Sequence, residues 1–146
     1  MNVIDVTLVA DTNAYADGDV LAIPQEIVNS VAEAGTARRL TSIVVIDGDD
    51  QGTAIDLIFF DASASLGTIN TAIDISDADA AKIVGIVAIA AGDFKDLINN
   101  KVAVKTGIDL IMKAASTSAS LWVGAVVRSG TPTYSAGGIK LKLGFA

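Results

Sequence analysis

Apolar side chains recur at every second position along much of this chain, and this period restricts the fold more than any other feature. In residues 139–145, four apolar side chains alternate with Lys140 and Lys142. The same alternation is present in residues 4–8 and 108–112. Successive side chains of a β-strand point to opposite faces, so each segment is predicted to be a strand with one buried and one solvated face.

Four further segments, residues 40–46, 53–60, 85–90 and 121–127, are apolar at both sets of alternate positions. Such segments are typical of strands in the centre of a sandwich, or of strands that have one face under a partner. We therefore expect a single all-β domain over residues 1–146, a sandwich or jelly-roll-like fold of eight to ten short strands with one short helix.

Glycine, proline and aspartate residues mark the connections between these strands. Residues 47–52, with the sequence DGDDQG, separate two strand patterns and predict a hairpin with a longer loop. Pro24 either ends the short strand at residues 20–23 or places it at a sheet edge. Gly137 and Gly138 predict the turn that precedes the last strand.

Ser76 is predicted to be the N-cap of the short helix. Asp77 and Asp79 follow it in the first turn, where the helix dipole favours negative charge. This helix is expected to stop near Gly85, and residues 93–100 are interpreted as a second, single turn.

The composition is more apolar than that of an ordinary domain, with 51% hydrophobic and 18% charged residues. Either the surface carries many small residues, or some apolar surface meets another subunit. Residues 1–80 hold 14 acidic and two basic residues, whereas residues 81–146 hold three acidic and eight basic residues. The two halves either neutralise each other locally or form oppositely charged surfaces.

The residue types in the chain argue against catalysis. It has no His and no Cys, so the familiar pairs of nucleophile and base are absent, as are thiolate zinc sites. No phosphate-binding loop or dinucleotide fingerprint occurs. We expect a protein that is not an enzyme, with no catalytic residues and no cofactor.

The sequence also argues against membrane and nucleic-acid partners. The longest apolar run, residues 83–91, is too short to cross a bilayer as a helix, and residues 1–5 do not resemble a signal peptide. The net charge of −7, without a basic stripe, disfavours nucleic-acid binding. We expect a soluble protein that is made in the cytoplasm.

Asp47, Asp49 and Asp50 share one glycine-rich loop and offer the oxygen ligands that Ca²⁺ prefers. The loop lacks the length and the terminal Glu of an EF-hand, so a solvated acidic loop is the favoured interpretation and no metal site is assigned. On this interpretation, changing Asp47 and Asp49 to Asn leaves stability almost unchanged, because exposed turn charges contribute little.

Five residues are candidates for contact with a partner: Tyr15, Trp122, Tyr134, Lys140 and Lys142. Trp122 lies on the opposite face of its strand from both neighbours and is either a core anchor or an interface anchor. The two tyrosines lie in predicted loops, either as packed loop anchors or as exposed contacts. The two lysines form a basic strand face that suits docking on an acidic surface.

Four segments, residues 11–21 (DTNAYADGDVL), 44–52 (VVIDGDDQG), 75–80 (ISDADA) and 132–145 (PTYSAGGIKLKLGF), resemble small structural proteins encoded beside the capsid genes of tailed phages and prophages. The resemblance extends over most of the chain. It implies a virion component, of the type that cements or decorates the outside of the major capsid lattice. It implies no catalytic or ligand-binding residues.

The resemblance therefore implies a phage capsid cement protein that stabilises the head, with the major capsid protein as its partner. It would be made in the bacterial host cytoplasm and reside in the virion. One alternative is another virion subunit, from the tail tube, the head-completion complex or the baseplate. A lectin-like binding module is a further alternative, although aromatic residues make up only 5% of the chain.

The high apolar fraction also predicts that the chain associates with itself as a dimer or trimer, because closed symmetry is usual in homo-oligomers. Light scattering at micromolar concentration should give a mass two or three times that of the 14.8 kDa chain. A monomer throughout this concentration range would contradict the prediction and leave only association on a lattice.

Overall fold

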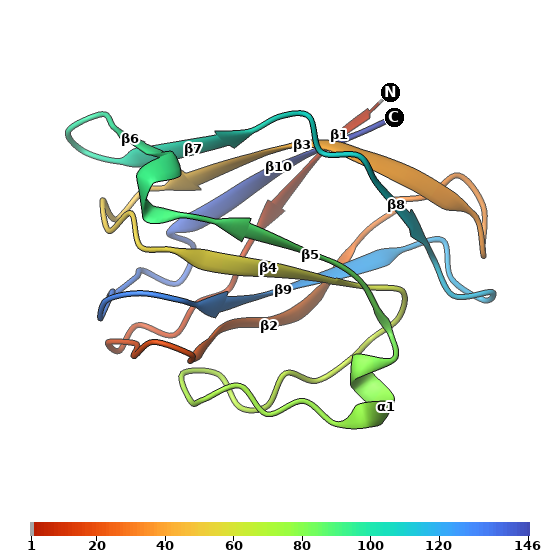
Figure 1. Ribbon diagram of the computed structural model, residues 1–146, viewed down its shortest axis with the longest axis horizontal. Helices are drawn as coiled ribbons and strands as arrows, with labels where there is room; N and C mark the ends of the chain where they lie inside the picture. The colour runs from red at the N-terminus through yellow and green to blue at the C-terminus, as the bar shows by residue number, and fades with distance from the viewer. Residues whose placement is uncertain (1) are drawn as a thin grey trace.

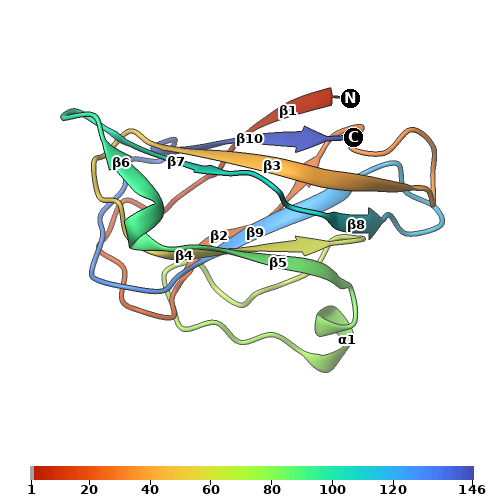
Figure 2. The same cartoon turned by 45° about the horizontal axis from the view of Figure 1, so that its top comes forward.

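The chain folds into two antiparallel β-sheets that pack face to face (Figures 1 and 2). The structure is a computed structural model and describes residues 2–146. Within these residues it contains ten strands, one four-residue α-helix and one short 3₁₀ turn. The prediction of an all-β sandwich with one short helix is confirmed.

The larger sheet has the strand order β1-β10-β3-β7-β6, and β8 pairs with the other end of β3. Its strands are β1 (Asn2–Thr7), β3 (Ala37–Asp47), β6 (Phe94–Asp96), β7 (Lys101–Lys105), β8 (Leu110–Lys113) and β10 (Ile139–Phe145). The smaller sheet has the order β2-β9-β4-β5. Its strands are β2 (Val20–Ile27), β4 (Ile55–Phe60), β5 (Ile83–Ile89) and β9 (Leu121–Val127).

The main core lies between the two sheets. Strand β10 lies between β1 and β3, and its side chains Ile139, Leu141, Leu143 and Phe145 are all buried. Leu57 and Phe59 of β4 belong to the same core from the opposite sheet. The carboxyl-terminal strand is therefore an integral core element, as its alternation predicts.

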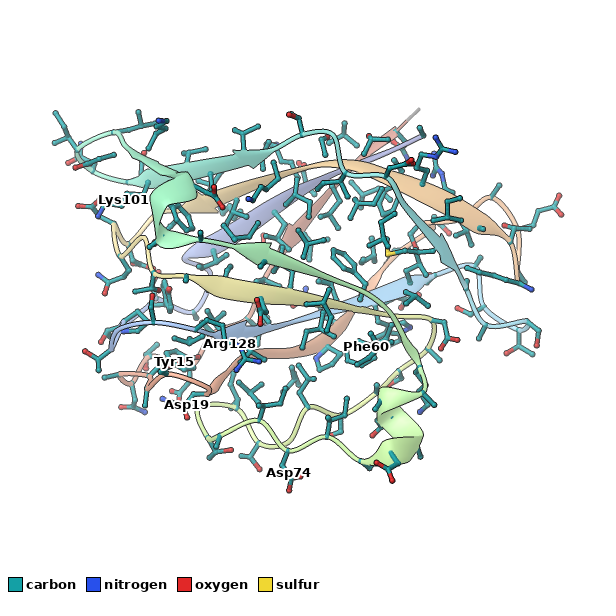
Figure 3. All side chains as sticks on the ribbon, in the orientation of Figure 1. Tyr15, Asp19, Phe60, Asp74, Lys101 and Arg128 are labelled. Atoms are coloured by element: carbon teal, nitrogen blue, oxygen red, sulfur yellow. The ribbon has the colours of Figure 1, made fainter. Side chains whose placement is uncertain are left out.

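A second, smaller core explains why β4 and β9 are apolar on both faces. Residues 61–82, which we call the cover segment, pass over the outer face of the smaller sheet and include helix α1 (Asp77–Ala80) (Figure 2). Leu66 of this segment packs with Ile58, Phe60 and Val126 of the sheet (Phe60 is labelled in Figure 3). A Cβ atom at Gly124 would lie 2.7 Å from the Leu66 side chain, so the glycine allows this close approach.

Hydrogen bonds attach the cover segment to β2 and to the segment that precedes it. The Val20 N–H donates to the Thr71 carbonyl and the Asn70 N–H donates to the Val20 carbonyl, both at 2.8 Å. The Asn70 side-chain amide also donates to the Asp11 carboxylate at 3.2 Å. This bond, followed by one from the Asn13 backbone, lowers the pKa of Asp11.

The helix begins as predicted, because the Ser76 hydroxyl accepts a hydrogen bond from the Asp79 N–H at 3.1 Å. It ends at Ala80, earlier than the predicted stop near Gly85, since β5 begins at Ile83. The prediction of a helical turn over residues 93–100 is wrong, because these residues form β6 and the turn that leads into β7. Pairing in this hairpin lets Phe94 pack against the main core.

The predicted hairpin around residues 47–52 is also wrong. Strand β3 belongs to the larger sheet and β4 to the smaller one, so this loop crosses between the sheets. Each strand has an apolar inner face, and crossing places those two faces against each other in the core.

The short strand at residues 20–23 is longer than expected, because β2 continues through Pro24 to Ile27. It lies at the edge of its sheet, which is the second alternative that proline allows.

The position of β10 predicts the effect of changing its side chains. Leu141→Ala removes a fully buried side chain and should lower the free energy of unfolding by about 2–5 kcal/mol. Lys140→Ala and Lys142→Ala should change it by less than about 1 kcal/mol, because both lysines face solvent. Urea unfolding of the three variants measures the difference, and a wild-type midpoint for Leu141→Ala would contradict the core assignment.

Candidate functional site

The outer face of the larger sheet is left open to solvent by residues 2–146, in contrast to the covered face of the smaller sheet (Figure 2). Strand register arranges its side chains in two rows. One row runs across five strands, from Thr7 through Lys140, Ile46 and Val102 to Lys95. The neighbouring row runs across four strands, from Asp5 through Lys142 and Val44 to Val104. We call the surface formed by these two rows the open face; β8, at the other end of β3, lies outside it.

The centre of the open face is apolar. Val44, Ile46, Val102 and Val104 form a four-residue group on β3 and β7, which we call the aliphatic patch. The first three side chains are half-buried, and Val104 is 57% exposed. An isolated exposed valine is ordinary, but four adjacent aliphatic side chains on an uncovered sheet form a surface that favours contact with a partner.

Lysines flank this patch on both sides. Lys140 and Lys142 of β10 lie on one side and Lys95 of β6 lies on the other. The Lys142 ammonium lies 3.1 Å from the Asp5 carboxylate, whereas no carboxylate of residues 2–146 lies within 4 Å of the Lys140 or Lys95 ammonium. A shallow hollow of about 250 Å³ is lined by Asp5, Lys140, Lys142 and Ile46.

The opposite side of the molecule carries the reverse charge. The cover segment contains Asp61, Asp74, Asp77 and Asp79 but a single basic residue, Lys82 (Asp74 is labelled in Figure 3). Lys82 pairs with Asp79 at 2.9 Å, and its hydrogen bond is the main cause of the lowered pKa of that carboxyl.

Both expected consequences of the uneven charge distribution are therefore present. Within residues 2–146, five of the six ion pairs join an acidic or basic group of residues 1–80 to its opposite in residues 81–146, as Arg128 joins Asp56 at 2.7 Å. These pairs neutralise charge locally. The charges that remain give the open face an excess of lysines and the cover segment an excess of carboxylates.

The structure places the predicted contact residues in different environments. Lys140 and Lys142 lie on the open face, as the strand alternation predicts. Trp122 lies on the outer face of β9, half-buried against the second core beneath the cover segment. It is therefore an anchor of this smaller core.

Tyr15 and Tyr134 are loop anchors in the folded chain, and their alternative assignment as exposed contacts is wrong. Each is 2% exposed, and their ring centroids are 6.0 Å apart. The Tyr15 hydroxyl donates to the Leu21 carbonyl at 2.9 Å, and the Tyr134 hydroxyl lies 2.6 Å from the Thr53 hydroxyl. Burial raises the pKa of Tyr134 to about 12. Both rings pack inward at the end of the sandwich where the loops before β2, β4 and β10 cross between the sheets.

The prediction that Asp47 is a solvated turn residue is wrong. Its side chain is fully buried and accepts hydrogen bonds from the backbone N–H groups of Asp49, Gln51 and Gly52 at 2.9, 3.0 and 2.7 Å. The loop leaves one sheet for the other here, so these N–H groups have no strand partner and the carboxylate supplies the acceptor.

Asp49 and Asp50 have separate roles in the same loop. The Asp49 carboxylate accepts hydrogen bonds from the backbone and hydroxyl of Ser135 at 2.9 and 3.1 Å, which joins this loop to the β9–β10 connection. Asp50 lies 3.9 Å from the Lys101 ammonium. A Cβ atom at Gly138 would collide with the Asp49 carboxylate, so glycine is required for this contact. Among the described residues, no group of three or more acidic, His or Cys side chains is arranged to hold a metal ion.

Sequence reasoning missed the part of the open face that β6 and β7 contribute. The signal was present in residues 101–105, KVAVK, where Val102 and Val104 alternate with other side chains. Its polar ends and short length made this strand less conspicuous than the longer apolar runs.

No protein-family model matches the chain, and no curated protein matches it either. Within residues 2–146, no helix is long and apolar enough to cross a membrane.

The contacts of Asp47 predict a stability loss that a solvated residue would not cause. Asp47→Asn replaces one accepting oxygen with a donor group, so at least one partly buried N–H loses its partner, and stability should fall by about 1–3 kcal/mol. Asp50→Asn is the matched control, because its residue is exposed and Asn tolerates the positive φ of 58°. It should change stability by less than about 0.5 kcal/mol. Equal urea midpoints for the two variants would contradict the structural role of Asp47.

Proposed function

We propose that this chain is a structural protein of a bacteriophage virion, of the decoration type that binds the outside of the major capsid lattice and stabilises the head. The observation that carries the proposal is the open face, with its aliphatic patch between lysines. The opposite sheet is covered by the chain itself, so the molecule has one face for a partner and one for solvent. The resemblance of four segments to virion proteins encoded beside capsid genes gives the partner its identity.

The physical properties of the open face suit a repeated lattice. A decoration protein meets many equivalent sites, so modest contacts at each copy add up to firm attachment when copies are linked. The aliphatic patch is small and the lysines that flank it are exposed, which is consistent with such modest contacts. No catalytic step is part of the proposal, since decoration needs complementary surfaces only.

The proposal includes association of the chain with itself as a dimer or trimer. Exposed apolar side chains remain along the side of the sandwich where the edge strands β1 and β2 lie, namely Val9, Ile23 and Val28. Val9 and Ile23 line a hollow of about 300 Å³ together with Pro24, Gln25 and Ile69. Linking copies in this way would supply the multivalency that lattice binding uses.

Copy number in purified particles tests the proposal. Quantitative mass spectrometry of particles from the strain that encodes the chain should find it at a stoichiometry comparable to that of the major capsid protein. A few copies per particle would indicate a head-completion or baseplate subunit instead. Absence from particles would overturn a virion role altogether.

A further inference from the structure

We propose that the open face docks onto an acidic protein surface of the capsid. Lys140 and Lys95 would form ion pairs with two carboxylates of that surface, and aliphatic side chains between those carboxylates would pack on the aliphatic patch. This inference rests on the proposed function and specifies the chemistry of the partner site. Under this arrangement the acidic cover segment points away from the capsid.

Strand register sets the spacing that the partner must match. Lys140 and Lys95 lie in one row with Ile46 and Val102 between them. Three strand spacings separate the two lysines, which is about 14 Å at roughly 4.8 Å per spacing. The partner surface therefore presents two acidic groups at about this separation, with aliphatic side chains between them.

The lysines on this face differ in whether they already have a carboxylate partner within the chain. Lys142 already has Asp5 as a partner at 3.1 Å, so its charge is partly compensated. Lys140 and Lys95 are exposed, and no carboxylate of residues 2–146 lies within 4 Å of either ammonium. The two unpaired lysines are consequently the ones that gain most from a carboxylate supplied by another protein.

Charge complementarity favours an acidic capsid surface as the partner of the open face. The chain as a whole carries a net charge of −7, yet this face presents three lysines against Asp5. An acidic capsid surface would be repelled by most of the molecule and attracted by the open face alone, which fixes the orientation of docking. The shallow hollow beside Lys140 and Lys142 gives room for an acidic side chain of the partner on the surface of the sheet.

A second copy of the chain fits this face less well. Its acidic cover segment would have to meet the open face of its neighbour, and these two surfaces lie on opposite sides of the molecule (Figure 2). Such a head-to-tail contact repeats without closing unless the rotation forms a ring, whereas homo-oligomers are mostly closed. Self-association through the β1 and β2 side leaves the open face free for the capsid.

Charge reversal with matched controls tests the inference. Lys95→Glu combined with Lys140→Glu should weaken binding to particles that lack the chain by about 100-fold, since each reversal is expected to cost about tenfold. Lys113→Glu makes the same change on β8. Lys113 pairs with Ala37 of β3, which lies nine residues from Ile46 along the same strand, so the control position is about 30 Å from the centre of the open face. This variant should bind like the wild type. Raising the salt concentration should weaken wild-type binding more than that of the double variant.

The apolar part of the contact has its own pair of variants. Val104→Ser should weaken binding about tenfold, whereas Ile86→Ser, at a 56% exposed residue on the outer face of the smaller sheet, should leave binding unchanged. Circular dichroism and urea unfolding of all four variants should match the wild type, because each change is at an exposed residue. A photo-crosslinking amino acid at position 104 should form an adduct with the major capsid protein.

The outcomes separate this inference from the proposed function. If the wild type binds particles and the double lysine variant binds equally well, the docking surface is wrong while the decoration role stands. An adduct between two copies of the chain would likewise overturn the capsid as occupant of this face. Failure of the wild type to bind particles would overturn both proposals.

Discussion

The structure depends on one requirement, that the sheet formed by β2, β9, β4 and β5 must be covered on both faces. Ile58 and Phe60 point outward from β4 while Leu57 and Phe59 point inward, and all four are buried. The larger sheet covers the inner face, and the cover segment with Leu66 covers the outer one. Because the described chain provides only one such segment, the outer face of the larger sheet remains open.

Polar groups hold the two sheets together at the end where the chain crosses between them. The Asp47 carboxylate organises one crossing loop, and Asp49 joins it to the connection before β10. Tyr15 and Tyr134 fill the space between these loops and place their hydroxyl groups on hydrogen-bond partners. An acidic loop that the sequence suggests for a cation or for solvent is thus satisfied internally, by backbone N–H groups that have no strand partner.

The same arrangement separates the charges of the molecule. Many charged groups form ion pairs within the fold. Of the other charged groups, carboxylates predominate on the cover segment and lysines on the open face. A surface of this kind gains little affinity from any single contact but gives a strong preference for one orientation. These properties support the proposal that the chain binds in many copies to an ordered lattice.

The sequence by itself determined where most strands lie, because the alternation of side chains is a local property of the chain. It placed Leu141 in the core, Lys140 on the opposite face and Ser76 at a helix start, and all three positions are confirmed. Only the tertiary structure decided which sheet each strand joins, which made a crossing loop of residues 47–52 and buried Asp47. Strand pairing also decided that residues from five different strands form the open face. Such pairing depends on which distant apolar faces pack together, and local periodicity carries no information about that choice.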